Sequence, residues 1–355
     1  MFPATENSDR AARRGLVAGG NWVSDHVKMI DMWPPQDALA SISSETISNG
    51  GGPYNVLKNL ARLGAPFPLR GVGLVGEDVD GRRILDDCRA HHIDTAQLRT
   101  TRDAPTSFTD VMTVQGTGRR TFFHQRGANR LLDVEHFDFT STPARWFHFA
   151  YLLLLDRLDA VEANGLPRIV RVLEAARAAG MTVSIDLVSE HSDRFAKIVR
   201  PALAHADVLF ANDFEAEKLT GFPLRDSTGV LLREATEKAA GFLLDAGVRE
   251  RVFLHFPEGV YAASRSGESG ESAWQASVNL PAIEIKGAVG AGDALAAGVI
   301  FGLHENLPLQ RSLELGVCAA AACLRHETCS EGILPSEDCL GLGRKFGFHC
   351  FEKIP

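Results

Sequence analysis

A glycine turn that ends in an aspartate is the feature of this sequence best suited to chemistry. Gly290, Ala291 and Gly292 precede Asp293, and the small apolar residues of 294–301 then favour a helix. The first N–H groups of a helix carry the positive end of its dipole, so such a turn can hold an anion, most often a phosphate. A carboxylate there can take a proton from an attacking hydroxyl. The pair indicates phosphoryl transfer to an alcohol, although an isolated string of this kind is more often a capped helix start.

A second glycine stretch resembles the first in its position before a helix. Gly50, Gly51 and Gly52 lead into residues 56–64, whose apolar positions fit one helical face and which end at a natural stop, Gly64. The start of this helix can also receive polar groups of a ligand.

Further polar side chains fall where strands are expected to end. Asp25, Asp186 and Asn212 each lie at or just beyond the end of a predicted strand, and the extended run 276–285 is predicted to lead into the 287–293 turn. Ligands of parallel sheets collect at the carboxyl ends of the strands. These residues are therefore expected to share one cleft.

The elements needed to position them alternate between strand and helix over most of the chain. Strands are expected at 16–20, 69–75, 146–153, 182–187, 208–211 and 252–256, with helices at 81–91, 166–179, 195–204, 214–219 and 231–246 between them. This alternation predicts an α/β fold with a mainly parallel sheet covered by helices on both faces. Residues 39–47 read as an exposed strand, and 108–113 with 121–125 as a β-hairpin.

Composition narrows the class of partner. The chain has 355 residues, a formal net charge of −8, and no apolar run of the ~20 residues that span a bilayer. This argues against nucleic acid or a membrane as the main partner. The six cysteines form no C-x-x-C pair and are typical of reduced thiols, so a cytoplasmic location is expected.

Other nucleotide-binding and catalytic motifs do not fit. Residues 71–76 match G-x-G-x-x-G, but the glycines fall within a predicted strand, and the acids at 77, 78 and 80 would face the pyrophosphate. A dehydrogenase is therefore disfavoured. The chain contains no G-x-x-x-x-G-K-[ST] and no G-x-S-x-G.

The two glycine stretches together resemble the ribokinase-like (PfkB) carbohydrate kinases over roughly residues 16–336. One signature is Gly50–Asn55 with Ala61–Gly64 and Gly73–Gly81; the other is Gly290–Asp293 with its helix. Asn212–Glu215 is similar to the family's N-x-x-E. The resemblance implies a kinase domain over 15–340 with a small β-sheet lid from about 26–48 and 104–127. A disordered leader, 1–14, and a C-terminal tail, 341–355, would flank it. A homodimer through the lid is implied as an option.

The resemblance also implies the roles of individual residues, with ATP and Mg²⁺ as cofactors and a small sugar as acceptor. Asp293 would be the base, and the backbone of Gly290, Ala291, Gly292 and Asp293 the anion hole. Asp25, Gly51, Gly52 and Asn55 would bind the sugar. Asn212, His255, Gly259 and Gly292 would lie at the nucleotide, and Asn212 and Glu215 would organise the metal, in part through water.

Each of these residues also has a purely structural interpretation, and the sequence departs from the family pattern. Asp25 can be a strand-end cap, Asn55 a helix cap and Glu215 a first-turn acid.

Gly287 and Ala288 replace the acid and hydroxyl residues of D-T-x-G-A-G-D, and His255–Gly259 replaces T-x-G-x-x-G. The leading interpretation is an ATP-dependent sugar kinase. A nucleoside kinase, or a non-catalytic sugar-binding or regulatory protein of this fold, is the alternative.

Overall fold

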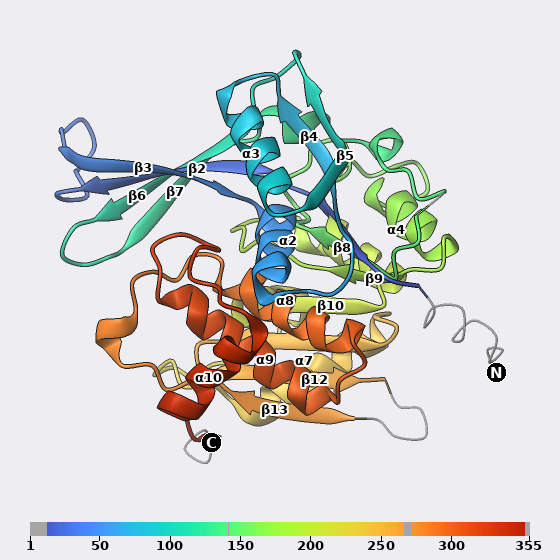
Figure 1. Ribbon diagram of the computed structural model, residues 1–355. Helices are drawn as coiled ribbons and strands as arrows, with labels where there is room; N and C mark the ends of the chain where they lie inside the picture. The colour runs from blue at the N-terminus through green and yellow to red at the C-terminus, as the bar shows by residue number, and fades with distance from the viewer. Residues whose placement is uncertain (1–12, 141, 266–270, 352–355) are drawn as a thin grey trace.

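The chain folds into one large and one small sheet. The computed structural model describes residues 13–140, 142–265 and 271–351. The large sheet has nine strands in the order β13-β12-β11-β10-β9-β8-β1-β4-β5, and the small sheet has four in the order β3-β2-β6-β7 (Figure 1). The large sheet contains β1 (Leu16–Gly20), β4 (Leu69–Gly76), β5 (Ile93–Thr101), β8 (Trp146–Ala150), β9 (Thr182–Ile185), β10 (Val208–Asn212), β11 (Arg251–Phe256), β12 (Gly259–Ser264) and β13 (Ser272–Ala276).

The large sheet confirms the predicted α/β class. Its pairings from β11 to β5 are all parallel, and only β12 and β13 run antiparallel at one edge. Parallel pairing brings the carboxyl ends of these strands to one edge, where ligands of such sheets bind.

Helices cover both faces of this sheet. They are α2 (Gly52–Leu63), α3 (Val79–Ala90), α4 (Ile169–Ala178), α5 (Arg200–Ala202), α6 (Asp213–Thr220), α7 (Arg233–Asp245), α8 (Ala291–His304), α9 (Leu309–Leu324) and α10 (Ser336–Phe346). Successive strand residues point to opposite faces. Thus Val17 joins the core beneath α4 and α7, whereas Leu16 and Ala18 join the core beneath α2, α8 and α9.

The small sheet projects from the body as a lid (Figure 1). It consists of β2 (Val23–Ile30), β3 (Ile42–Gly50), β6 (Ser107–Val114) and β7 (Arg120–Gln125). Strands β2 and β6 are parallel, and β3 and β7 add antiparallel edges. This arrangement confirms that a small β-sheet accompanies the large one. Its strands lie within 23–50 and 107–125, beside the expected ranges of about 26–48 and 104–127.

The glycines of the G-x-G-x-x-G string have a packing role. They lie within β4, where a Cβ on Gly73 would come 2.2 Å from Nε1 of Trp22, and one on Gly71 would come 2.8 Å from the same ring. The Trp22 indole is buried and donates to the carbonyl of Val72 at 2.9 Å. The glycines thus admit a tryptophan, in agreement with the rejection of a dinucleotide site.

The prediction of a strand directly before the 287–293 turn is wrong. Strand β13 ends at Ala276, and the following chain contains a 3₁₀ turn at Ala282–Glu284. Pro281 begins this turn and accepts a bond from Glu284, and a proline cannot donate to a sheet ladder. The 287–293 turn therefore follows a loop.

Several elements beyond those predicted complete the fold. Strand β5, the β12–β13 hairpin and helices α9 and α10 all pack into it. The boundary expected at residue 340 falls inside α10, and the chain pairs again at Val278 with Phe348. Residues 1–12 of the expected leader lie outside the described residues, and Arg13 bonds to the carbonyls of Thr142 and Ala144.

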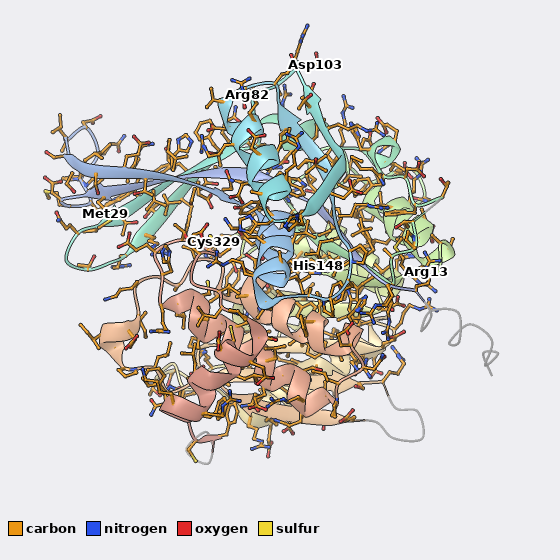
Figure 2. All side chains as sticks on the ribbon, viewed as in Figure 1. Arg13, Met29, Arg82, Asp103, His148 and Cys329 are labelled. Carbon is orange, nitrogen blue, oxygen red and sulfur yellow. The ribbon has the colours of Figure 1, made fainter. Side chains whose placement is uncertain are left out.

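Side chains fill the space between sheet and helices, with His148 among them, and Cys329 lies where the lid meets the body (Figure 2). Within the described residues, no helix has the length and apolar character to cross a bilayer.

Candidate active site

A cavity of about 610 Å³ lies between the lid and the carboxyl ends of the central strands. Its walls come from β2, β6 and β7 of the lid, the start of α2, the loops after β8 and β9, the ends of β10 and β11, and the start of α8. Nine of the residues named from sequence line it: Asp25, Gly51, Asn55, Asn212, Glu215, His255, Gly290, Gly292 and Asp293. The expected shared cleft is therefore present, and it also contains Asp186.

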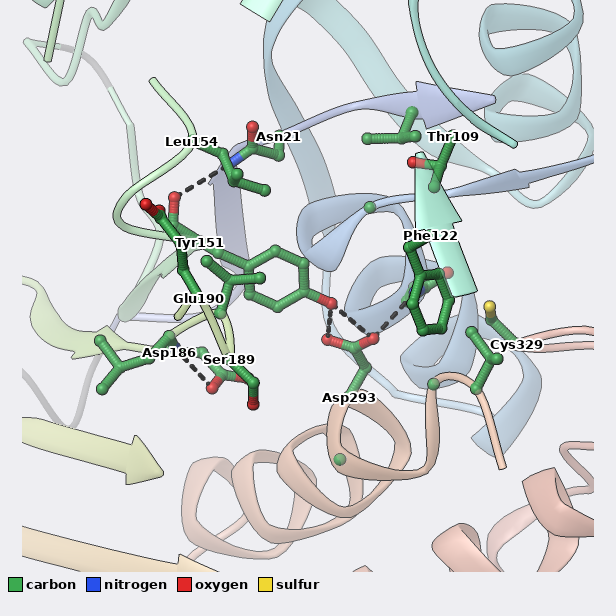
Figure 3. A pocket seen from close by; sticks show the side chains of 18 of the residues that line it. Asn21, Thr109, Phe122, Tyr151, Leu154, Asp186, Ser189, Glu190, Asp293 and Cys329 are labelled. Carbon is green, nitrogen blue, oxygen red and sulfur yellow. Dashed lines mark hydrogen bonds between the residues drawn. The ribbon is translucent and has the colours of Figure 1, made fainter. Parts of the chain in front are cut away.

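Asp293 lies in the first turn of α8 and is held at both carboxylate oxygens. The Tyr151 hydroxyl donates to Oδ1 at 2.7 Å and to Oδ2 at 2.8 Å, and Asn55 Nδ2 donates to Oδ2 at 2.8 Å (Figure 3). Burial raises the pKa of Asp293 to about 6, and the hydrogen bonds from Asn55 and Tyr151 oppose this rise. A carboxylate with this pKa is mostly ionised near neutral pH and can accept a proton.

The turn before Asp293 requires its glycines. Gly290 has φ +79°, and a Cβ there would lie 2.6 Å from the Cβ of Cys329. Gly292 lies against His255, whose Cε1 would be 3.1 Å from an added Cβ. The first N–H groups of α8 have no acceptor within the helix, so the turn presents donors beside Asp293. Ala291 belongs to this turn but is not among the lining residues.

Gly50 and Gly51 before α2, and Gly52 at its first position, make room for other parts of the site. A Cβ on Gly50 would lie 2.1 Å from Oδ2 of Asp25, and one on Gly51 would lie 2.0 Å from the carbonyl oxygen of Asn21. A Cβ on Gly52 would meet Tyr151 Cε1 at 3.0 Å, so this glycine acts behind the cavity wall. The stretch is therefore a packing device that lets the lid, α2 and the loop after β8 converge.

Asp25 and Asn55 do not have the capping roles considered for them. Asp25 lies within β2, opposite Ser48 and Thr109, and Asn55 lies inside α2. Burial, and next the charge of Asp293, raise the pKa of Asp25 to about 7. Both side chains are directed to the cavity and stand close to the Asp293 carboxylate.

Asn212 and Glu215 form a capping box at the start of α6. Asn212 Oδ1 accepts from the Glu215 N–H at 2.9 Å, and Glu215 Oε2 accepts from the Asn212 N–H at 3.0 Å. The Ser189 hydroxyl donates to Glu215 Oε1 at 2.9 Å. Glu215 is thus a first-turn acid of α6, which is the structural interpretation considered for it, and both residues also line the cavity.

Three acids meet at the inner wall of the cavity. Asp186 is buried, and its pKa is raised by desolvation, then by the charges of Asp293 and Glu215. No group of three or more His, Cys, Asp or Glu residues within the described chain has the geometry of a direct metal site. The excess of buried negative charge nevertheless suits a hydrated Mg²⁺, which keeps several of its own waters.

His255 lines the cavity, whereas Gly259 lies outside it. Burial lowers the pKa of His255 to about 4, so its imidazole is neutral at physiological pH and offers one N–H donor without a positive charge. Gly259 opens β12 outside the cavity lining, with φ +152° and a Cβ position 2.2 Å from the Gln275 carbonyl. A glycine is required there by the hairpin.

The sequence interpretation missed Tyr151, Asn21 and His124. Tyr151 follows the buried strand β8 within an apolar run that was predicted as strand, so no local signal distinguished it. Its partner Asp293 is 142 residues away in the chain. Asp186 was recognisable only as a polar residue at a strand end.

The fold and this site define a class of phosphotransferase, and sequence comparison identifies it. Residues 22–336 match the pfkB family of carbohydrate kinases, and the chain belongs to that family. It is therefore a carbohydrate kinase.

Individual relatives are distant. A 5-dehydro-2-deoxygluconokinase from Geobacillus thermodenitrificans (strain NG80-2) is 24% identical over 289 residues, 80% of each chain. An ATP-dependent ribose-1-phosphate kinase from Halopiger xanaduensis is 28% identical over 85% of this chain and 88% of its own. The structure of Arabidopsis thaliana ribokinase, complexed with ribose and ATP, superposes with a TM-score of 0.74 at 19% identity, covering 93% of this chain and 98% of that one.

Proposed function

We propose that this protein transfers the γ-phosphoryl group of ATP to a hydroxyl of a small sugar, with Asp293 as the general base. The observation that carries the proposal is the buried Asp293 carboxylate at the first turn of α8, fixed by Tyr151 and Asn55 at the wall of the cavity. The acceptor hydroxyl would give its proton to Asp293 as its oxygen attacks phosphorus.

The N-terminus of α8 would stabilise the charge of the transferred group. The backbone N–H groups of Ala291, Gly292 and Asp293 would face the phosphoryl oxygens, and Gly290 would hold the turn. Because phosphoryl transfer has a loose transition state, positioning and electrostatic stabilisation supply most of the catalysis.

The acceptor would lie on the lid side of the cavity. Asp25, Asn55 and the backbone at Gly51 would contact it, while Gly52 would act indirectly by admitting the Tyr151 ring. Closure of the lid over this side would exclude water, which otherwise competes as a phosphoryl acceptor.

The nucleotide would lie on the opposite side, near Asn212, His255 and Gly292. Mg²⁺ would neutralise phosphate charge, with Glu215 and Asn212 holding it through its waters. Gly259 would support this region only as part of the β11–β12 hairpin. We further propose that the kinase domain includes α10 and that two copies associate through the lid.

Phosphoryl transfer from Mg·ATP to a panel of pentoses, hexoses and nucleosides tests this proposal. Asp293→Asn keeps the size of the side chain but removes the base, and we expect kcat to fall by about 10²–10⁴. Asp86→Asn on the exposed face of α3 is the matched control and should retain wild-type rates. Wild-type turnover by Asp293→Asn on the best substrate would exclude Asp293 as the base.

A further inference from the structure

We propose that the acceptor is an uncharged polyol and that the site rejects sugars that carry a phosphate or carboxylate. The inference rests on the proposed function and names the substrate class of the same site. It departs from the cited relatives, because one is named for a phosphorylated sugar, ribose 1-phosphate, and another for a sugar acid, 5-dehydro-2-deoxygluconate.

Two buried amides leave acceptor oxygens without partners in the cavity. Asn21 Nδ2 donates to the Tyr151 carbonyl at 2.8 Å, and Asn55 Nδ2 donates to Asp293. These donor bonds fix which way each amide points, so Oδ1 of each remains as an acceptor beside the cavity. Both Oδ1 atoms are buried and have no hydrogen-bond partner among the described residues.

His124 adds a third acceptor on the lid. Its Nδ1 lies 2.9 Å from the Thr109 hydroxyl, which also bonds to the carboxylate of Asp25. When Asp25 is ionised, its carboxylate can only accept, so the single hydroxyl proton goes to Asp25 and Nδ1 of His124 is the donor to Thr109. Its Nε2, buried and without a partner in the described chain, is then an acceptor.

The charges around the cavity also favour an uncharged ligand over an anion. Asp25 and Asp293 are close enough for the charge of Asp293 to raise the pKa of Asp25. None of the lining side chains in the described part of the chain is Lys or Arg. His124 is neutral, because burial and the charge of Arg126 lower its pKa to about 4.

The nearest lid cations do not supply an anion site. Arg126 is paired with Asp156, and Arg120 lies against Gly287, where an added Cβ would be 3.1 Å from Nη2. Neither is among the lining residues. A ligand group that pairs with Asn21, Asn55 or His124 here must therefore donate a hydrogen bond. Hydroxyl groups do so, whereas an ionised phosphate or carboxylate only accepts.

Binding to the full chain can be measured by calorimetry with matched ligands. D-ribose and D-fructose would be compared with D-ribose 5-phosphate, D-fructose 6-phosphate and D-gluconate, with turnover followed in parallel using Mg·ATP. We expect at least one uncharged sugar to bind about 100-fold more tightly than its charged counterpart, because like charges placed together are costly. Tighter binding of any charged sugar than of its uncharged counterpart would overturn the proposal.

Two variants separate charge from shape. Asp25→Asn should lower the ratio of the affinities for an uncharged sugar and its charged counterpart by about tenfold, since it removes one negative charge at constant size. Asp86→Asn should leave the preference unchanged. An unaltered preference in Asp25→Asn would overturn the role of charge.

The two proposals can fail separately. Turnover of charged sugars alone would leave the kinase assignment intact and contradict the substrate class. Binding of uncharged sugars without turnover would contradict the proposed reaction and leave the substrate class intact. Failure of every uncharged sugar to bind would overturn the substrate class.

Discussion

At the scale of single residues, the base is defined by a balance between burial and hydrogen bonding. Burial alone disfavours the charged carboxylate of Asp293, and the donors Tyr151 and Asn55 restore part of its acidity. Both oxygens are engaged by Tyr151, yet each carboxylate oxygen has two acceptor positions. Oδ1 receives only the tyrosine bond among the described contacts, so it has room for the acceptor hydroxyl.

Tyr151→Phe should move the acidic limb of the pH–rate profile upward. The wild-type value of kcat/KM should fall as pH drops through about 6, because Asp293 must be ionised. Removing a donor to the ionised form raises the pKa of Asp293, and a hydrogen bond to a charged group corresponds to a shift of about one pH unit.

The pH profile of the steady-state rate provides the measurement, and Tyr261→Phe on β12 is the control, because its hydroxyl lies outside the cavity lining. An unchanged acidic limb in Tyr151→Phe would show that Tyr151 does not tune the base.

Asp25 gives a prediction about stability in the absence of ligand. Its folded pKa of about 7 exceeds the ordinary value of 3.8, so ionisation opposes folding above pH 7, and this penalty disappears below about pH 4. Asp25→Asn should therefore raise Tm at pH 8 and have a smaller effect at pH 5. Thermal unfolding at the two pH values measures this, with Asp86→Asn as the reference. A gain in Tm that is larger at pH 5 has the wrong sign for a raised pKa.

The sequence alone identifies those site residues that form a recognisable motif with their neighbours along the chain. Gly290, Gly292 and Asp293 are adjacent, so their type and order carry the signal. Tyr151, Asn21 and His124 acquire their roles only when distant segments meet, and an aromatic residue in an apolar run looks like core. The Asn212–Glu215 pair was recognisable, but its spacing also specifies the capping box that the structure contains.

At the scale of elements, the glycines at the start of α2 determine how closely the lid, α2 and the loop after β8 approach one another. Gly52→Ala would place a Cβ 2.4 Å from the Cβ of Ala150 and 3.0 Å from the Tyr151 ring. Overpacking of this kind costs about 1–3 kcal/mol, and we also expect lower kcat because Tyr151 and Asp293 lose their alignment.

Gly241→Ala in α7 is the matched control, because nothing lies within 4 Å of its added Cβ. It should stabilise the protein by up to about 1 kcal/mol through helix propensity. Urea unfolding and initial rates test both variants. Equal stability of Gly52→Ala and the wild type would mean that the close approach is not required.

Elements with strong periodicity were predictable, and those defined by long-range contacts were not. The alternation of buried strands and helices indicated the parallel sheet. Strand β5 alternates buried and exposed residues less regularly, and the second half of α9, residues 315–324, is uniformly apolar, so neither gave a clear pattern. The run 276–285 has strand-like composition, but after Ala276, the last residue of β13, its β-pairing among the described residues is the isolated bridge of Val278 with Phe348.

At the scale of the whole molecule, the lid is a sheet with two different faces. The row of Asp25, Thr109 and His124 faces the cavity. The next row, Ile47, His26, Asp110 and Phe123, lies on the opposite face by strand alternation. Ile47 is 45% exposed and Phe123 is 51% exposed, one on each edge strand. Apolar side chains at exposed edges favour association with another protein surface.

We expect the combined Ile47→Ser and Phe123→Ser substitutions to convert a lid-mediated dimer into a monomer. Serine removes the apolar area that would be buried between two lids, and the cavity-facing row is left intact. Sedimentation velocity at micromolar concentration measures the assembly. Val161→Ser, which alters an equally exposed residue outside the small sheet, is the control and should stay dimeric. If the lid also depends on the partner for its closed position, KM for the sugar should rise in the double variant with a smaller change in KM for ATP. A wild-type protein that sediments as a monomer, or a double variant that remains dimeric, would contradict association through this face.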